Sequence, residues 1–479
     1  MTDRRIESIK NVFLVVLFST TILLLYLLWS HNSNNFSILN ILAGSGEKAD
    51  VPRLEEVMAP RYVAISDGSG VFRMADGYTA HVAAAASEAL TEACGQGSVA
   101  VSEINRMQFS AVMSRYNSIQ TALCCDIPFS DYAAYNGVSI GAPADQIQTV
   151  SLIAFSDASK ESIFIYDGPQ DRYFRLRTSA DHEYTAQLVS MCTAGSASCY
   201  PASEILGFGR AYIAVGVESS LSEGSFISEA AERGRDLRTS MAETVMGENF
   251  DFVRRISDGF GNTTYMYGYG QKTFTARADG SFEYSSELSS GSAGDFYSDL
   301  KTAVTFVARC GGWPGLGGEQ ISLVLDSADS FGEGRQAGHT FRFKQLLGGV
   351  PVRGEGEYPV EITVTNGQVS YYRRAVINYL EMTWSGVSQT AEPVNVIANN
   401  CNHIYNVMHN NTLVAAVDEA FSEVSEALVD MHQGYFESSQ GNDLVPCWIV
   451  RMNDGSDFFF DLYDAAPLGF RRSEDHGLE

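Results

Sequence analysis

An almost entirely apolar run lies close to the start of the chain, between Val12 and Trp29. None of these eighteen residues is charged, and only Ser19, Thr20 and Thr21 interrupt the run with small polar groups. As a helix the run would extend about 27 Å, near the lower end of what the hydrocarbon core of a bilayer requires. The pattern therefore predicts a transmembrane helix over residues 12–30.

The residues that flank this run predict its orientation. Arg4, Arg5 and Lys10 precede it, and the excess of positive charge favours a cytoplasmic location for residues 1–11. Tyr26 and Trp29 lie at its other end, where aromatic rings anchor a helix among lipid headgroups. We therefore expect a single-pass protein of the cell membrane, with its N-terminus in the cytoplasm and the bulk of the chain outside.

A cleaved signal peptide is the alternative interpretation of the same run. Such a peptide has an apolar core of about 7–15 residues, followed by small residues around a cleavage site. The run here is longer, and the candidate site at Ala43 has the bulky Ile41 at its −3 position. These features favour an uncleaved signal-anchor, which N-terminal sequencing of the mature protein would test.

Alternation of apolar and polar residues begins after a polar tether at 31–57. It predicts an α+β domain over residues 58–200. The expected strands are 61–65, 71–74, 119–123, 149–155, 162–166 and 173–177, and the expected helices are 79–94 and 106–116.

Three turn signals between alternating runs predict β-hairpins farther along the chain. They are Asp279-Gly280, Asn366-Gly367 and Asp454-Gly455. Such Asp-Gly and Asn-Gly pairs are the strongest short-range hairpin signal, because the tight turn needs residues that tolerate positive φ. In the first hairpin, Phe274 and Phe282 are expected to face inward.

Two helices are predicted between these hairpins, at 293–309 and 413–431. The second has an apolar stripe at helical spacing, formed by Val417, Phe421, Val424, Leu428 and Met431.

The fold class predicted from these patterns is α+β. An N-terminal transmembrane helix is followed by a multi-domain ectodomain of antiparallel sheets and packed helices. Beyond the first domain we predict a β-rich middle domain at 201–290 and a C-terminal α+β domain at 291–479.

Composition narrows the function. The formal net charge of −26 argues against nucleic-acid binding, which needs clustered Lys and Arg. Hydrophobic residues make up 45% of the chain, enough to build packed cores. Eight cysteines are too few for a disulfide scaffold. Cys192 and Cys199 flank a short loop and are the candidate disulfide, whereas the adjacent Cys124 and Cys125 are expected to be buried as small apolar residues.

Two motifs raise the question of catalysis or metal binding. The stretch 137–141 matches the G-x-S-x-G pattern around Ser139, but polar residues precede it and Pro143 follows, unlike the strand and helix that a nucleophile elbow needs. Cys401, His403 and His409 could ligate a metal only if a loop gathered them, because on a helix the two histidines point in different directions. We therefore predict no catalytic residue, no metal site and no cofactor.

Several segments, taken in order, resemble the YycH family of extracytoplasmic regulators. They are MAPRYVAISDGSGVF at 58–72, NSIQTALCCDIPF at 117–129, VRRISDG at 253–259, YGYG at 267–270, DGSFEY at 279–284, FVARCGGW at 306–313 and FRFKQLLGGVPV at 341–352. The last predicted helix and PCWIV at 446–450 are similar to the sister regulator, YycI. The resemblance covers most of the chain, and the cysteines and Gly/Ser-rich loops depart from it.

This resemblance implies a helper of the two-component system that controls cell-wall metabolism in Gram-positive bacteria. The implied partners are the sensor histidine kinase and a YycI-like regulator. Ser19, Thr20 and Thr21 are then candidates for contact with other membrane helices, although they could equally bond their own backbone. The alternatives are a cell-surface module that binds a wall polymer or ligand and, less favoured, a hydrolase. An exposed aromatic groove at Trp313, Trp384 or Trp448 would indicate the ligand-binding module.

Overall fold

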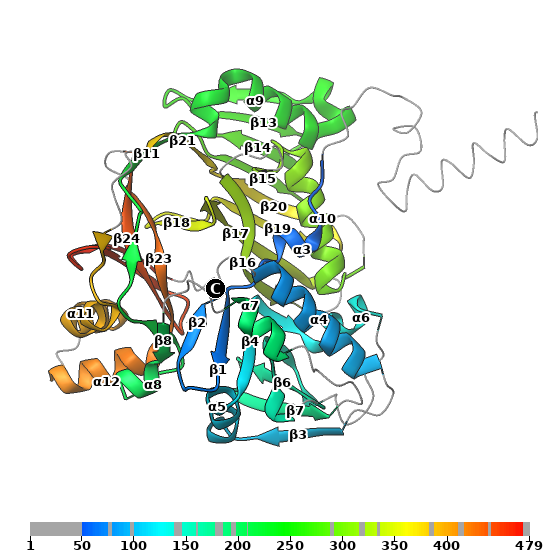
Figure 1. Cartoon of the computed structure of the whole chain (residues 1–479). Coiled ribbons are helices and arrows are strands. Elements are labelled where there is room, and N and C mark those ends of the chain that lie inside the picture. Colours follow the sequence, from blue (N-terminus) through cyan, green and yellow to red (C-terminus); the bar gives the residue numbers. More distant parts are fainter. Residues whose placement is uncertain are drawn as a thin grey trace, which may run out of the picture. The chain divides into compact units, whose positions relative to one another are not determined.

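Two large β-sheets carry the part of the chain that the computed structural model describes (Figure 1). That part is residues 50–472 without 75–78, 96–99, 138–145, 160, 178–184, 193–197, 208, 288–291, 316–320, 333–335, 383–387, 411–415 and 439–441. The predicted membrane segment and its candidate residues Ser19, Thr20, Thr21, Tyr26 and Trp29 therefore lie outside the described residues. Within the described residues, no helix is both long enough and apolar enough to cross a membrane.

The first sheet has nine strands in the order β3-β7-β6-β5-β4-β1-β2-β8-β9. Their bounds are β1 Tyr62–Asp67, β2 Phe72–Met74, β3 Ala100–Ile104, β4 Asn117–Pro128, β5 Thr149–Ser156, β6 Ser162–Asp167, β7 Arg172–Arg177, β8 Ser198–Pro201 and β9 Tyr212–Ala214. All the strands predicted before residue 200 are present. The first residue of each predicted strand lies within about two residues of the observed start. The predicted strand at 119–123 is part of the longer β4.

The second sheet has fifteen strands. They are β11 Gly224–Ser228, β12 Arg254–Ser257, β13 Thr263–Tyr267, β14 Lys272–Ala276, β15 Phe282–Ser286, β16 Ile321–Phe331, β17 Gly338–Leu347, β18 Val350–Gly354, β19 Val360–Thr365, β20 Gln368–Arg374, β21 Ile377–Met382, β23 Leu428–Ser438, β24 Asp443–Met452, β25 Asp457–Asp461 and β26 Pro467–Arg471. A separate two-stranded sheet joins β10 Glu218–Ser219 to β22 Ser388–Gln389.

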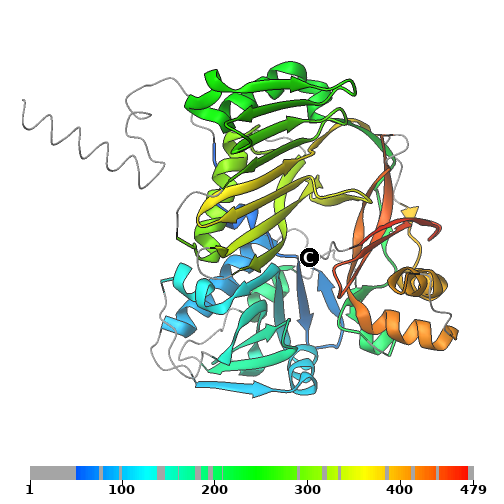
Figure 2. The same ribbon diagram turned by 180° about the vertical axis from the view of Figure 1, so that it is seen from behind.

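Helices cover these sheets. Their bounds are α3 Leu54–Val57, α4 Thr79–Gly95, α5 Arg106–Arg115, α6 Phe129–Tyr135, α7 Thr185–Cys192, α8 Ala202–Ile205, α9 Glu229–Met246, α10 Phe296–Arg309, α11 Pro393–Met408 and α12 Val417–Ala427. The helix α9 was not predicted, and Gly234 within it has a φ of 65°, which breaks its helical geometry. Helices α11 and α12 lie side by side against the last strands (Figure 2).

The three predicted hairpins are confirmed. Asn366 and Gly367 have φ values of 54° and 70° and join β19 to β20, as a two-residue turn with positive φ at both positions requires. In the β14–β15 hairpin, Phe274 and Phe282 are both buried. Gly280, Gly367 and Gly455 all have positive φ, a conformation that would strain a residue with a larger side chain.

Strand β6 of the first sheet is buried on both faces. Along β6, Ile163 and Ile165 belong to one apolar cluster, and Phe164 between them belongs to another. Because successive side chains of a strand point to opposite faces, a continuous apolar run is what a strand covered on both sides requires. Val82 of α4 packs on the first face and Phe109 of α5 on the second.

Helix α10 covers the second sheet at β17, β19 and β20. Asp295 caps its N-terminus by accepting a hydrogen bond from the backbone N–H of Ser298 at 2.8 Å. Phe296, Leu300 and Val304 recur at helical spacing and are buried on its sheet-facing side. This element agrees with the predicted helix at 293–309.

The predicted helix at 413–431 is confirmed over Val417–Ala427 and is wrong over its last four residues. Helix α12 ends at Ala427, and Leu428 and Met431 belong to β23. That strand pairs with β24 on one side and in parallel with β18 on the other. The apolar residues Leu428 and Met431 can be buried in a strand as well as in a helix. Hydrogen bonds to strands that are distant in sequence decide the conformation.

The described residues from Asp50 onwards form one compact unit. The domain boundaries predicted near residues 200 and 290 stay predictions. The mixed α+β class is confirmed.

Candidate functional site

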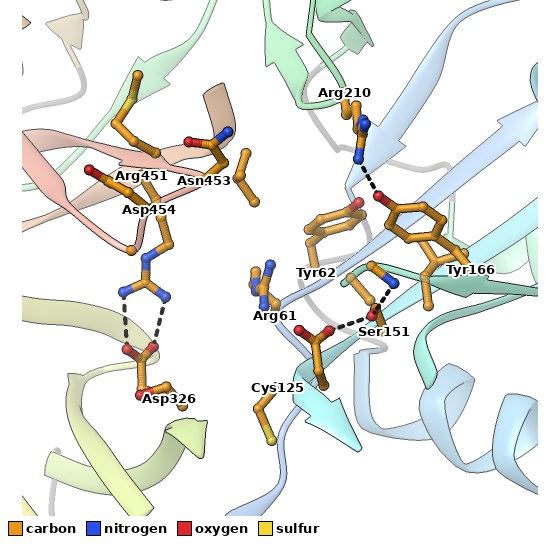
Figure 3. Close-up of a pocket in the computed structure, with 18 of the residues that line it drawn as sticks. Arg61, Tyr62, Cys125, Ser151, Tyr166, Arg210, Asp326, Arg451, Asn453 and Asp454 are labelled. Carbon is orange, nitrogen blue, oxygen red and sulfur yellow. Dashed lines mark hydrogen bonds and ion pairs between the residues drawn. The ribbon is translucent and has the colours of Figure 1, made fainter. Parts of the chain in front are cut away.

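A cavity of about 840 Å³ opens between residues of the two large sheets (Figure 3). One wall comes from β1, β4, β6, β7, β9 and α5 of the first sheet region. The other wall comes from β16, β17, β24, β26 and the loop around Tyr358. A volume of this size is typical of sites that hold a small ligand.

The first wall is aromatic. The ring centroids of Tyr166 and Tyr173 lie 4.6 Å apart, and that of Phe109 lies 4.9 Å from Tyr173. Tyr62 meets Tyr212 edge to face at 6.0 Å. The four tyrosines come from separate strands of one sheet, and Phe109 comes from α5, which packs on that sheet.

The phenol groups of this wall are held as hydrogen-bond donors and acceptors. The side-chain amide of Gln120 donates to the hydroxyl of Tyr212 at 2.6 Å. Arg210 donates to the hydroxyl of Tyr166 and pairs with Asp171 at 2.6 Å. Burial raises the pKa of Tyr166 to about 12, so this phenol stays protonated at neutral pH.

A buried charged cluster forms part of the second wall and extends behind it. Its members are Asp326, Lys344, Arg353, Arg451, Asp457 and Arg471. They come from β16, β17, β18, β24, β25 and β26. Of the six residues, Asp326, Arg451 and Arg471 line the cavity.

Asp326 is the first of the two carboxylates in the cluster. It pairs with Arg353, with Nη2 of Arg451 at 3.0 Å and with Nζ of Lys344 at 3.3 Å. Burial alone would raise the pKa of Asp326, but these three cations hold it well below its usual range. The carboxylate is therefore ionised at neutral pH.

Asp457 is the second carboxylate. Nε of Arg451 lies 2.8 Å from one oxygen, and the other oxygen pairs with Arg471 and lies 3.6 Å from Nη1 of Arg353. Burial opposes ionisation of Asp457, and the three guanidinium groups outweigh it and lower its pKa. Arg451 thus bridges both carboxylates.

Tyr358 and Arg342 extend this wall. The guanidinium of Arg471 lies 4.1 Å from the ring centroid of Tyr358 and donates to its hydroxyl at 3.2 Å. Such a cation over an aromatic face is stabilised by the ring quadrupole. Arg342 pairs with Asp329 and, at 3.3 Å, with Glu361.

Arg61 lies between the two walls (Figure 3). It directly precedes β1, where its backbone N–H donates to the carbonyl of Ala122 at 2.9 Å. Its Nε is buried and has no hydrogen-bond partner among the described residues. A guanidinium that faces a cavity in this way is available to a ligand.

The described cysteines, histidines and tryptophans that the sequence singled out lie outside the cavity, apart from Cys125. Cys199 is buried in β8, while the side chain of Cys192 lies outside the described residues, so their disulfide stays a prediction. Cys124 and Cys125 are buried as predicted, with their sulfurs 4.0 Å apart, and Cys125 lines the cavity. Ser139 of the G-x-S-x-G stretch lies outside the described residues.

The three residues considered for a metal are separated by their environments. Cys401 is buried in α11 and points to the carbonyl of Ala398 at 3.3 Å. The ring of His403 lies edge on to Phe458, and Nε2 of His409 lies 2.7 Å from Glu423. No group of three metal-ligating side chains is found in the part of the chain that the structure describes.

Neither Trp313 nor Trp448 lies in an exposed groove of the kind considered above. Trp448 is buried and donates its indole N–H to the carbonyl of Ala391 at 3.1 Å. Trp313 is buried against Phe343, with ring centroids 5.5 Å apart. Trp384 lies outside the described residues.

The sequence reasoning missed the charged cluster, although one signal for it exists. Arg451 stands within the apolar run of β24, and Asp457 directly precedes three phenylalanines. A charge inside such a run is ordinarily taken to face water, because alternate residues of a strand lie on opposite faces. Here the opposite face is also covered, so the charges are buried and must pair with one another.

Comparison with known proteins places the fold. No protein-family model and no curated protein sequence matches the chain. The crystal structure of YycH from Bacillus subtilis matches it with a TM-score of 0.51 at 11% identity, over 84% of this chain and 96% of that one. The resemblance to YycH is confirmed at the level of the fold, which is YycH-like.

A second solved structure is similar over a smaller part. It is an uncharacterized protein from Eubacterium rectale, at 11% identity and a TM-score of 0.31, which covers 55% of this chain and 86% of that one. A likeness of that degree carries no argument about fold or function.

Proposed function

We propose that this protein is a YycH-type extracytoplasmic regulator that binds a sensor histidine kinase and adjusts its activity. The observation that supports this proposal is the match to YycH, which extends over 96% of that structure. A shared fold along nearly the whole length is more informative than a shared single domain. The implied system controls cell-wall metabolism, and a YycI-like regulator is the implied second partner.

We further propose that residues 12–30 anchor the protein in the cell membrane, with the N-terminus in the cytoplasm. The apolar run and the preceding Arg4, Arg5 and Lys10 support this topology. Ser19, Thr20 and Thr21 then offer small polar groups for contact with a helix of the kinase.

The chemistry of the cavity favours binding over catalysis. A general acid or base works best with a pKa near the operating pH. Asp326 and Asp457 instead have pKa values far below neutrality, because guanidinium groups surround them despite their burial. Carboxylates locked in ion pairs are poorly suited to exchange protons with a substrate, so a hydrolase is the less favoured function.

Reconstitution with the kinase tests the regulatory proposal. The full chain and the sensor kinase would be placed together in lipid nanodiscs, and kinase autophosphorylation would be measured with and without the chain. A coupling of about 1–3 kcal/mol would change kinase activity about 5- to 150-fold. If the two proteins neither co-purify nor alter autophosphorylation, the proposal is wrong.

Substitutions in the apolar run test the membrane contact separately. Replacing Ser19, Thr20 and Thr21 together by leucine should weaken co-purification with the kinase, because interhelical hydrogen bonds and close packing are lost. The matched control replaces Leu23, Leu24 and Leu25 by isoleucine, which leaves the run apolar. Equal co-purification of both variants would exclude a contact at the polar residues.

A fusion to alkaline phosphatase tests the topology. Placed at the C-terminus of the full chain, the phosphatase should be active on intact cells and remain in the membrane fraction. Activity released into the medium, or a mature N-terminus beyond residue 35, would show that the segment is cleaved.

A further inference from the structure

We propose that the cavity between the two large sheets binds a small organic anion, with a carboxylate or phosphate at one end and a ring in its body. Arg61 is assigned to the anionic group and the tyrosines of the first wall to the ring. This inference goes beyond the proposed regulation of a kinase, and its test uses the isolated protein.

Pairing rather than net charge singles out one group in the cavity. Seven arginines and seven carboxylates line it, so the lining carries no net formal charge. The side chains of six of these arginines already donate to or pair with other groups; they are Arg106, Arg210, Arg342, Arg451, Arg471 and Arg472. Arg61 is the remaining one.

Arg61 lies where the two walls meet. Its buried Nε has no hydrogen-bond partner among the described residues. Asp430 is the carboxylate that interacts with Arg61 electrostatically, and Asp430 is itself paired with His432 at 3.0 Å. A guanidinium presents N–H groups in a fixed plane that matches a carboxylate or phosphate. An anion in the cavity would supply the partner that the folded chain leaves out.

Carboxylates also line the cavity, and their placement decides where the anion would bind. Asp126, Glu355, Glu357 and Asp454 are exposed, so water screens them. Asp326, Asp329 and Glu361 are paired with arginines. An anion at Arg61 would therefore meet carboxylates that are screened by water or already paired with a cation.

The aromatic wall provides the surface for the rest of the ligand. Tyr62, Tyr166, Tyr173 and Tyr212 all line the cavity. Each combines an apolar ring face with a hydroxyl, a combination that suits a sugar or another polar ring. The hydroxyls of Tyr166 and Tyr212 are oriented by Arg210 and Gln120, so the wall is fixed before a ligand arrives.

Calorimetry with matched probes tests the proposal on the full chain in a mild detergent. The probes are glucuronate and glucose 6-phosphate, with neutral glucose as the comparison, because the three share a ring and differ in charge. At least one anion should bind with a dissociation constant of about 1 mM or tighter, and glucose should bind more weakly. A higher salt concentration should weaken the binding of the anion but not that of glucose.

Variants connect the binding to Arg61. Arg61→Gln should weaken the anion about tenfold or more, and Arg61→Lys, which keeps the charge but not the planar fork, should fall between it and the wild type. Arg254→Gln removes an equal charge from the exposed strand β12 and should bind like the wild type. Circular dichroism and thermal unfolding would verify that each variant is folded.

Three outcomes would overturn the inference. They are the absence of anion binding at about 10 mM probe, equal binding of glucose and the anions, and unchanged anion affinity in folded Arg61→Gln. A kinase that fails to respond to the protein would contradict the proposed regulation and leave these binding outcomes unaffected.

Discussion

Two regions of the second sheet are buried to a similar degree and are held together by different forces. Beneath α10, Phe296, Leu300 and Val304 pack on strands β17, β19 and β20. At the cavity, the charged cluster joins six strands through ion pairs, and Asp457 is as inaccessible to water as Leu300. The first region is assembled by apolar burial and the second by charge pairing.

The difference lies in how each region responds to the loss of one member. Apolar packing is non-directional, so a truncated side chain costs its own burial and a partly relaxed cavity. In the charged cluster, each member neutralises others, and removal of one leaves buried charges without partners. We therefore expect a substitution in the charged cluster to lower the free energy of unfolding more, and by an amount that depends on pH. A substitution under α10 should lower it less, and by the same amount at every pH.

The largest effect is expected for Asp457→Asn. The substitution keeps the shape of the side chain but leaves Arg353, Arg451 and Arg471 with one carboxylate fewer. Removing one partner of a buried ion pair lowers the free energy of unfolding by about 3–5 kcal/mol. Urea unfolding, read as the free energy of unfolding, would measure the loss.

Two controls sharpen this prediction. Asp236→Asn removes an exposed carboxylate from α9 and should be nearly neutral. Adding Arg471→Met to Asp457→Asn should recover part of the loss, because a buried charge is removed together with its partner. A loss below about 1 kcal/mol for Asp457→Asn would mean that water reaches the guanidinium groups.

The next effect is expected for Leu300→Ala under α10. Leu300 is fully buried, and truncation of such a residue costs roughly 3 kcal/mol. Because no charge is involved, the loss should be the same across pH and salt concentration. Lys301→Ala on the exposed side of the helix is the matched control. If the loss in free energy of unfolding for Leu300→Ala varied with pH, the proposed difference between the two regions would be wrong.

Glu437 of β23 lies between these extremes, as a partly buried carboxyl with Arg373 as its nearby cation. Burial raises the pKa of Glu437 to about 7, and Arg373 only partly opposes this rise. A raised pKa in the folded protein means that stability is full below the unfolded value near 4.5 and is lost as pH rises through about 7.

Glu437→Gln should therefore stabilise the protein at about pH 8 by roughly 1–2 kcal/mol, after allowance for partial solvent screening. At about pH 4 the variant and the wild type should unfold alike, because both side chains are then neutral. Thermal unfolding at several pH values would test this prediction, and a stability difference that did not change with pH would contradict it.

The smallest effect is expected for the exposed pair of Arg277 and Glu283. Nε of Arg277 lies 3.1 Å from the carboxylate, and half of the arginine side chain is exposed. Arg277→Gln should cost less than about 1 kcal/mol, and the loss should vanish at about 1 M salt. An effect as large as that of Asp457→Asn would show that burial does not explain the difference between charge pairs.

The same comparison explains what the sequence could predict. Local signals were sufficient for the hairpin at Asn366-Gly367 and for α10, because turn chemistry and helical spacing act over a few residues. They failed at Leu428, where a strand partner far along the chain overrides the apolar spacing of a helix. The YycH-like fold was recognised because the order of packing segments carries more information than any single motif.

The candidate site was beyond such reasoning. Arg451 belongs to β24 and Asp326 to β16, and the sequence around either residue does not predict that the two form an ion pair. Alternation along β24 places Arg451 opposite Val450 and Met452, and that face would ordinarily be assigned to solvent. The pairing depends on which strands meet across the sheet, which is a property of topology.

Strand β11 has a consequence for the order in which the protein can be completed during synthesis. Residues 224–228 pair with β21 and with β24, whose residues leave the ribosome much later. The first sheet has all its strands once residue 214 has emerged, whereas β11 must keep both edges open until its partners arrive. Such distant pairing slows folding and exposes strand edges to wrong partners. A ribosome stalled before residue 443 would therefore hold a finished first sheet beside an unfinished second one.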